Sequence, residues 1–223
     1  MNINLIFKDV KTFIKKENGL LCLLILTDLI FVFIHTLYLY GITDDNSNYS
    51  LEKDFGYSEV FQYIKEYWIF LLLLFIFIRK KKITYFIWSV FFLYLLLDDS
   101  LSIHENYGEL LANYFNITPQ FNLRSVDFGE ILVSLSVGVS FLILLLLAYI
   151  KGGIREREIT RTLALFIIML AFFGVFVDLI HVALPIQKNK IAVIEDGGEM
   201  LVMSIILSYV FMNYSHLKLY LQK

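Results

Sequence analysis

Several runs of about twenty apolar residues constrain this chain more than any other feature of its sequence. A helix needs roughly 20 apolar residues to cross the hydrocarbon core of a bilayer. A chain of 223 residues that is 58% hydrophobic has no soluble core large enough to bury all of these runs. The sequence therefore predicts an all-α integral membrane helical bundle of about six transmembrane helices. The predicted spans cover residues 19–40, 59–78, 83–110, 128–150, 162–184 and 191–214.

The cationic residues predict how this bundle is oriented. Cytoplasmic segments of membrane proteins carry an excess of Lys and Arg, and with six spans 14 of the 19 cationic residues fall on one side and 5 on the other. Both termini are therefore expected in the cytoplasm. The lysine-rich start precedes an apolar stretch that runs to Tyr40, too long for a signal peptide and without a cleavage site, so a retained first helix is expected.

The loops between the spans are too short for a separate soluble domain, so residues 1–223 are expected to form a single transmembrane domain. The abundance of Ile, Phe, Asn, Lys and Tyr suggests an AT-rich bacterial genome and hence a bacterial cytoplasmic membrane. A net charge of −2 indicates no attraction to nucleic acid. Cys22 is the single cysteine and excludes an intramolecular disulfide. Membrane lipids are the expected partners, and the sequence does not fix an oligomeric state.

Most acidic residues fall on the outer side or in the outer ends of the predicted spans. From Ile83 to Leu97 the third span rises only about 22 Å, less than the ~30 Å of the hydrocarbon core. The helix must therefore continue through Asp98 and Asp99 before it reaches water. A lipid-facing pair of aspartates would be costly, so this face is expected to point into the bundle. At helical spacing the following residues share or border that face: Asp98, Ser102, His104, Glu105 and Glu109.

The fifth and sixth spans place similar groups at a similar depth. Asp178 and His181 are i, i+3 neighbours that can share one ligand, and Glu195 and Glu199 are i, i+4 neighbours that project together, with Asp196 beside them. Standard soluble-enzyme motifs, such as a phosphate-binding glycine loop or His-Glu-x-x-His, are absent. The convergence of ionisable groups in the outer third of the membrane is therefore the main functional signal.

Two further sets of acids have simpler interpretations. Asp28 lies alone near mid-membrane, where a protonated carboxyl that is hydrogen-bonded across helices is favoured over a proton relay. Acids near the membrane interfaces are expected to be solvated charges at helix ends, and Asp127 to cap its helix. These interfacial acids are Glu59, Glu66, Asp127 and Glu130.

Clustered carboxylates in a low-dielectric site need a counter-charge, which a metal cation would supply. Histidine and carboxylate ligands suit Zn, Fe or Mn, and a metal with an open position would activate water for hydrolysis. The first hypothesis is thus a membrane-embedded metal-dependent hydrolase that acts on a lipid or another amphipathic substrate. The predicted metal ligands are His104, Glu105, His181 and Glu199, and the predicted catalytic groups are Asp178 and Glu195. Asp98, Asp99, Ser102, Asp196 and His35 are expected to orient ligands or contact substrate.

This arrangement, with Ser, Asp and His side chains inside a predicted helical bundle, resembles that of the intramembrane metal hydrolases, which include alkaline ceramidases and adiponectin-type receptors. The points of resemblance are Ser102, His104, Asp178 and His181. That group has two histidines four residues apart on a late helix, where this chain has Glu195 and Glu199. Because of this difference, no residue role is carried over from the group.

Two alternatives remain open. The acidic cluster can form the outer vestibule of a cation- or proton-coupled transporter or channel, in which Asp28 would be a proton relay. It can also belong to a non-enzymatic membrane subunit or sensor that recruits a partner through its acidic outer face.

Overall fold

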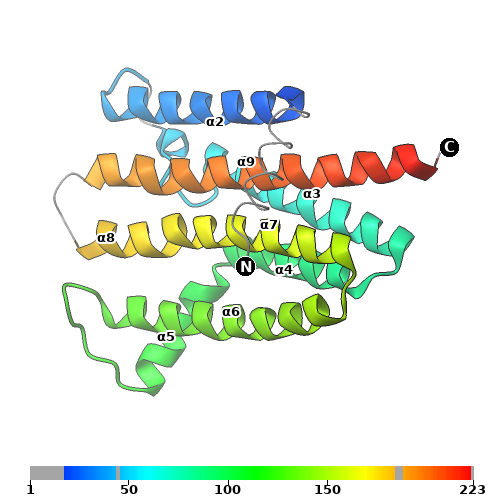
Figure 1. Cartoon of the computed structure of the whole chain (residues 1–223). Coiled ribbons are helices and arrows are strands. Elements are labelled where there is room, and N and C mark those ends of the chain that lie inside the picture. The colour runs from blue at the N-terminus through cyan, green and yellow to red at the C-terminus, as the bar shows by residue number, and fades with distance from the viewer. Residues whose placement is uncertain (1–17, 44–45, 184–187, 222–223) are drawn as a thin grey trace.

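The structure, a computed structural model, describes residues 18–43, 46–183 and 188–221 (Figure 1). The described residues form helices and no strands, which confirms the all-α prediction. The helices are α2 (Asn18–Leu39), α3 (Tyr57–Lys80), α4 (Ile83–Leu101), α5 (Ile103–Tyr114), α6 (Ser125–Lys151), α7 (Ile154–Ala171), α8 (Asp178–Ala183) and α9 (Lys188–Leu221). Two short segments complete the elements of the described residues: the 3-10 turn η1 (Ser47–Tyr49) and the π-helical segment η2 (Phe172–Val177).

Five helical segments within the described residues are long and apolar enough to cross a membrane. They are 19–39, 57–80, 83–101, 125–151 and 154–182. These segments match the first five predicted spans and indicate an integral membrane protein. The sixth predicted span, 191–214, falls within α9, which is not among the five, and it remains a prediction. The lysines before residue 18 lie outside the described residues.

The predicted third span, 83–110, is wrong in one respect, because it is two helices rather than one. Helix α4 ends at Leu101, Ser102 takes up a left-handed backbone conformation with φ of 47°, and α5 begins at Ile103. Positive φ is uncommon outside glycine and ends the regular helix. The expected common face of Asp98 with Glu105 and Glu109 is therefore lost, since the two helices run in different directions (Figure 1).

The fifth predicted span, 162–184, also differs in detail. Its helix starts earlier, at Ile154, and winds as a π-helix over η2 before α8 begins at Asp178. A π-helical turn adds a residue within a helix and is frequent at functional sites. Here the π-helical segment rotates the side chains after residue 177 about the helix axis, relative to where a continuous α-helix would place them.

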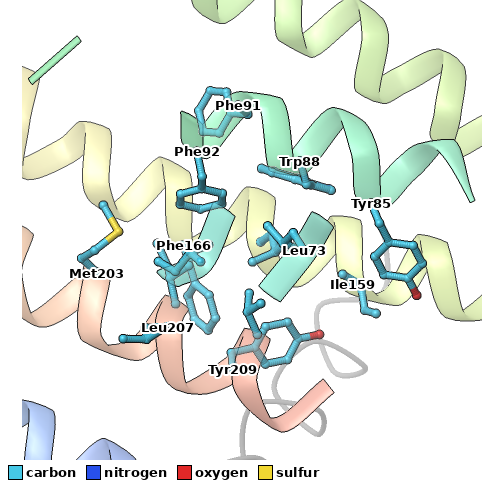
Figure 2. Packing of buried hydrophobic residues seen from close by; sticks show 14 of the residues in the cluster. Leu73, Tyr85, Trp88, Phe91, Phe92, Ile159, Phe166, Met203, Leu207 and Tyr209 are labelled. Carbon is cyan, nitrogen blue, oxygen red and sulfur yellow. The ribbon is translucent and has the colours of Figure 1, made fainter. Parts of the chain in front are cut away.

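The buried core lies where α3, α4, α7 and α9 meet (Figure 2). Leu73, Trp88, Phe92, Phe166 and Met203 fill this space, each with 3% of its surface or less exposed. Helix α2 packs mainly on α9, and α6 packs on α4 and α5. Most of α6 exposes apolar side chains, as expected of a surface that faces lipid. Examples are Leu135, Leu142, Leu146 and Ile150.

The two ends of the bundle differ in charge. The α3–α4 turn with Arg79–Lys82 and the α6–α7 turn with Lys151–Arg161 lie at one end, together with the C-terminal end of α9 (Figure 1). The loop with η1, the α5–α6 loop, α8 and the start of α9 lie at the opposite end. We call these the basic end and the acidic end. The positive-inside rule places the basic end in the cytoplasm, and this orientation remains a prediction.

Candidate functional site

A cavity of about 190 Å³ opens at the acidic end of the bundle. Its walls come from the loop after η1, the first turns of α3, the α4–α5 junction and the first part of α9. Among the described residues that line it, carboxyl groups outnumber the cationic groups, which are Lys53 and His104. The lining carboxyls belong to Glu52, Asp54, Glu59, Asp99, Glu105, Asp196 and Glu199. The cavity is therefore a strongly acidic space at this end of the bundle.

Two contacts hold the loop that closes one side of the cavity. The backbone N–H of Leu51 donates to Nδ1 of His35 over 3.1 Å, which makes His35 the neutral tautomer with its proton on Nε2. The backbone N–H of Phe55 donates to the Glu59 carboxylate. His35, predicted as a ligand-orienting or substrate residue, is fully buried and does not line the cavity. It positions the loop.

Glu66 on α3 is a fully buried acid next to Asp99, which lines the cavity. Its carboxyl contacts that of Asp99, and its electrostatic neighbours include Glu199 and Lys65. Neither oxygen of Glu66 receives a hydrogen bond from a donor among the described residues. Two carboxyls can share a hydrogen bond only if one holds a proton. The pair therefore needs a bound proton or another cation. Asp99 and Glu199 are partly exposed to the cavity.

A buried ion pair lies next to these acids. Nζ of Lys65 is 3.1 Å from Oδ1 of Asp28 and donates to the carbonyl of Met200 over 2.9 Å. The hydroxyl of Ser204 donates to Oδ2 of Asp28 over 2.5 Å. Lys65 and Asp28 have 0% and 1% of their side chains exposed. The network links α2, α3 and α9, so Asp28 is hydrogen-bonded across helices as predicted, but it is paired with a lysine and does not lie alone.

His104 is paired with Asp98 at the start of α5. The Asp98 carboxylate accepts the backbone N–H of His104 over 2.8 Å, and its other oxygen lies 3.1 Å from Nδ1 of the ring. Asp98 thereby satisfies one of the free N–H groups at the helix start. The side-chain contact with Asp98 raises the pKa of His104 from its ordinary 6.5 to about 9, against the opposite effect of burial. His104 lies beyond the end of the α4 span and is cationic at neutral pH.

We expect the Asp98→Asn variant to lower the pKa of His104 from about 9 toward 6.5. Since the folded pKa is raised, the ion pair stabilises the protein fully below the unfolded pKa and is lost as the pH rises through about 9. Histidine NMR titration in detergent micelles measures this pKa, with the His104 signal assigned from a His104→Gln variant. Glu109→Gln, an exposed acid on the same helix, serves as the control. Equal pKa values in the wild type and Asp98→Asn would contradict the pairing.

His181 lies between two carboxylates at the acidic end. Its Nδ1 is 2.7 Å from Glu195 on α9, and its Nε2 is 3.6 Å from Glu52 in the loop. The Asp178 carboxyl contacts that of Glu195. Asp178, His181 and Glu195, which the sequence predicted at a similar depth in the membrane, thus come together. This cluster holds the loop, α8 and α9 to one another.

The four predicted metal ligands do not line one space. His104, Glu105 and Glu199 line the cavity, whereas His181 does not. Within the described parts of the chain, no group of three or more His, Cys, Asp or Glu side chains is arranged to hold a metal ion. Both ring nitrogens of His181 and one of His104 instead face carboxylates. The metal site stays a prediction that the geometry does not support. Of the accessory residues, Asp99, Ser102 and Asp196 line the cavity.

Sequence reasoning missed the buried polar residues of α3. Glu66 was assigned to solvated helix ends, which is wrong because its side chain is fully buried, and the equally buried Lys65 was given no role. The sequence did contain a signal for this burial, because adjacent Lys and Glu residues inside an apolar span need partners within the bundle. Ser58 and Gln62, which line the cavity from the same helix, were also missed. For Asp127 the expected cap is confirmed: its carboxylate accepts the N–H of Arg124 over 2.6 Å.

Comparisons with known proteins give a family but no activity. No curated protein and no solved structure matches the chain. Residues 49–213 match a family model described as a domain of unknown function, DUF8692. The matched region contains α3 to α7 and most of α9, and with them every wall of the cavity. Since the model covers well over half of the 223 residues, the chain belongs to the DUF8692 family.

Proposed function

We propose that this protein is a multi-pass membrane protein that binds a small cation in its acidic cavity and works as a cation- or proton-coupled transporter or channel. The observation that carries the proposal is the contact of Glu66 with Asp99, since neither Glu66 oxygen receives a hydrogen bond from a donor among the described residues. A carboxyl pair of this kind takes up and releases a proton or another cation. Asp99 opens onto the cavity and Glu66 lies behind it, so the pair connects the surface with the interior.

The ion pair of Lys65 and Asp28 supports the same proposal. Ionisable residues inside a membrane bundle are costly and mark ion or proton pathways. Along α3, Glu66 lies about 12 Å beyond Ser58 at the usual rise per residue, and Lys65 adjoins Glu66 and reaches Asp28 on α2. Proton exchange between Glu66 and this pair is the next step. The positive-inside rule would then place the cavity on the outer side of a cytoplasmic membrane.

The metal-dependent hydrolase remains the competing hypothesis, and it draws no support from the described residues. A catalytic metal typically needs three protein ligands and an open position. The predicted histidines are instead engaged with Asp98, Glu52 and Glu195.

In proteoliposomes with an imposed pH gradient, we expect protein-dependent proton uptake that falls at least tenfold in the Glu66→Gln variant. The amide keeps the size of the side chain but cannot release a proton in the working pH range. A pH-sensitive dye inside the vesicles measures the uptake. Glu109→Gln is the matched control, because Glu109 is an exposed acid outside the cavity.

Unchanged uptake in Glu66→Gln would contradict the role of this residue. Absence of flux for protons, Na⁺ and K⁺ would contradict transport as such. If the purified protein then held near-stoichiometric Zn, Fe or Mn, and the double variant His104→Ala/His181→Ala lost it, the metalloenzyme hypothesis would replace ours.

A further inference from the structure

Helix α5 exposes a stripe of large apolar side chains. Tyr107, Leu110 and Tyr114 are 58%, 62% and 78% exposed. At the α-helical period these three positions fall within an arc of about 60°. The exposed polar residues Glu109 and Asn113 lie on a different face of the helix. An exposed apolar stripe rimmed by polar residues marks a surface that contacts a membrane or another protein.

A third face of α5 packs on the start of α6. Gly108 and Ala112, one turn apart, are the buried residues of α5. The backbone of Gly108 lies directly against Gly129 of α6, where a Cβ atom would overlap it. Helix α5 runs obliquely to α6 (Figure 1). The contact at Gly129 therefore fixes the level along α6 at which α5 crosses it.

The length of α6 places this crossing at the edge of the hydrocarbon core. Helix α6 has 27 residues, which rise about 40 Å, whereas the hydrocarbon core of a bilayer is ~30 Å thick. A centred α6 therefore extends about 5 Å beyond the core at each end. Gly129 is the fifth residue of this helix, which puts it about 6 Å from the helix start. The crossing thus lies where acyl chains meet headgroups.

The chemistry of the stripe fits this boundary. Tyrosine is enriched at membrane–water interfaces, where its ring contacts acyl chains and its hydroxyl reaches the headgroups. Helix α5 contains the acids Glu105 and Glu109 and no Lys or Arg, so zwitterionic headgroups suit it better than anionic ones. A stable protein interface needs about 800 Å² per partner, whereas a large side chain buries at most about 250 Å². The three side chains of the stripe are therefore too few for a protein partner.

We propose that α5 is an interfacial helix whose stripe of Tyr107, Leu110 and Tyr114 is immersed in zwitterionic phospholipid, at the boundary of acyl chains and headgroups in the leaflet at the acidic end. His104 and Glu105 in the first turn of α5 line the acidic cavity. The same helix thus presents one face to lipid and its start to the cavity. This lipid contact does not depend on the proposed cation transport.

Spin labels on single cysteines test the proposal in the full-length protein, reconstituted in phosphatidylcholine nanodiscs. Cys22→Ser removes the native thiol, which is exposed on α2. A label at Leu142→Cys, an exposed position in the middle of α6, is the reference for acyl chains. Collisions of each label with dissolved O₂ and with a polar nickel chelate are measured, because O₂ concentrates in acyl chains and the chelate stays in water.

Labels at Leu110→Cys and Tyr114→Cys are expected to collide with the nickel chelate at least about tenfold less often than labels at Glu109→Cys and Asn113→Cys, because a polar solute is excluded from acyl chains. Their O₂ collisions are expected to approach those of the α6 reference. The two pairs are matched, since all four positions are exposed on the same helix. Circular dichroism checks that each labelled variant keeps its helical content.

Equal nickel collision rates on the two faces would overturn the proposal, because the stripe would then lie in water. Few collisions with either reagent at Leu110→Cys and Tyr114→Cys would overturn it too, since a second copy or another protein would then cover the stripe. Nickel collisions that fall at the stripe only after phosphatidylglycerol is added would contradict the preference for zwitterionic lipid. Low nickel and high O₂ collisions at the stripe would uphold the lipid contact whether or not the protein conducts ions.

Discussion

Replacement of Lys65 by methionine is expected to lower the free energy of unfolding by about 3–5 kcal/mol, the usual cost when one partner of a buried ion pair is removed. The Lys65 ammonium is the only cation that contacts Asp28 among the described residues, and both side chains are almost wholly buried. Without it, Asp28 must either stay charged in a low-dielectric site or take up a proton. Unfolding in increasing dodecyl sulfate, followed by circular dichroism, measures the change. Lys151→Met, at an exposed lysine, is the control.

The double variant Asp28→Leu/Lys65→Met separates stability from function. Replacing both members of a buried ion pair by apolar residues is often neutral or stabilising, because the desolvation cost of both charges disappears. We therefore expect the double variant to recover most of the stability that Lys65→Met loses. If proton uptake is lost in this stable protein, the pair serves transport. A single Lys65→Met variant as stable as the wild type would contradict the buried pair.

The pairing of Lys65 with Asp28 also shows where sequence reasoning stops. Hydropathy and charge counting found the helical class and the position of most spans, because each helix must satisfy its backbone hydrogen bonds within itself and match the bilayer thickness. They contain no information on which helices are neighbours. The contact between α2 and α9 brings Asp28 to Ser204, residues 176 positions apart in sequence. Asp28 was therefore interpreted as a lone residue, without Lys65 as its partner.

The break at Ser102 limited the prediction of the site itself. A continuous helix from residue 83 to 110 was a natural expectation from length and hydropathy, yet the backbone turns at Ser102 and Asp98 caps the second helix. Asp98 was therefore placed on one face with Glu105 and Glu109, although its carboxylate in fact pairs with His104. The acidic residues themselves were found correctly at one end of the bundle, because charge position along each span is a local property of the sequence.

The α5–α6 packing gives a second large expected effect. Gly108 on α5 and Gly129 on α6 face each other, and a Cβ atom added at Gly129 would overlap the carbonyl oxygen of Gly108. The obstacle is backbone, which cannot rotate away as a side chain can. A Cβ atom added at Gly138, on the same helix as Gly129, would meet no atom within 4 Å. Gly129 and Gly138 thus form a matched pair: a methyl group added at Gly129 would overlap backbone atoms, whereas one added at Gly138 would not.

Gly129→Ala is accordingly expected to lower the free energy of unfolding by about 1–3 kcal/mol or more, the range for overpacking a close contact. Gly138→Ala is expected to be neutral or to stabilise by up to about 1 kcal/mol, since alanine is the better helix former. Dodecyl sulfate unfolding compares the two variants. Because α5 carries His104 and Glu105 into the cavity wall, a shifted α5 should also reduce cation binding in Gly129→Ala alone. Equal stability of the two variants would mean that α5 does not pack closely on α6, and the cavity would then lack the wall that α5 provides.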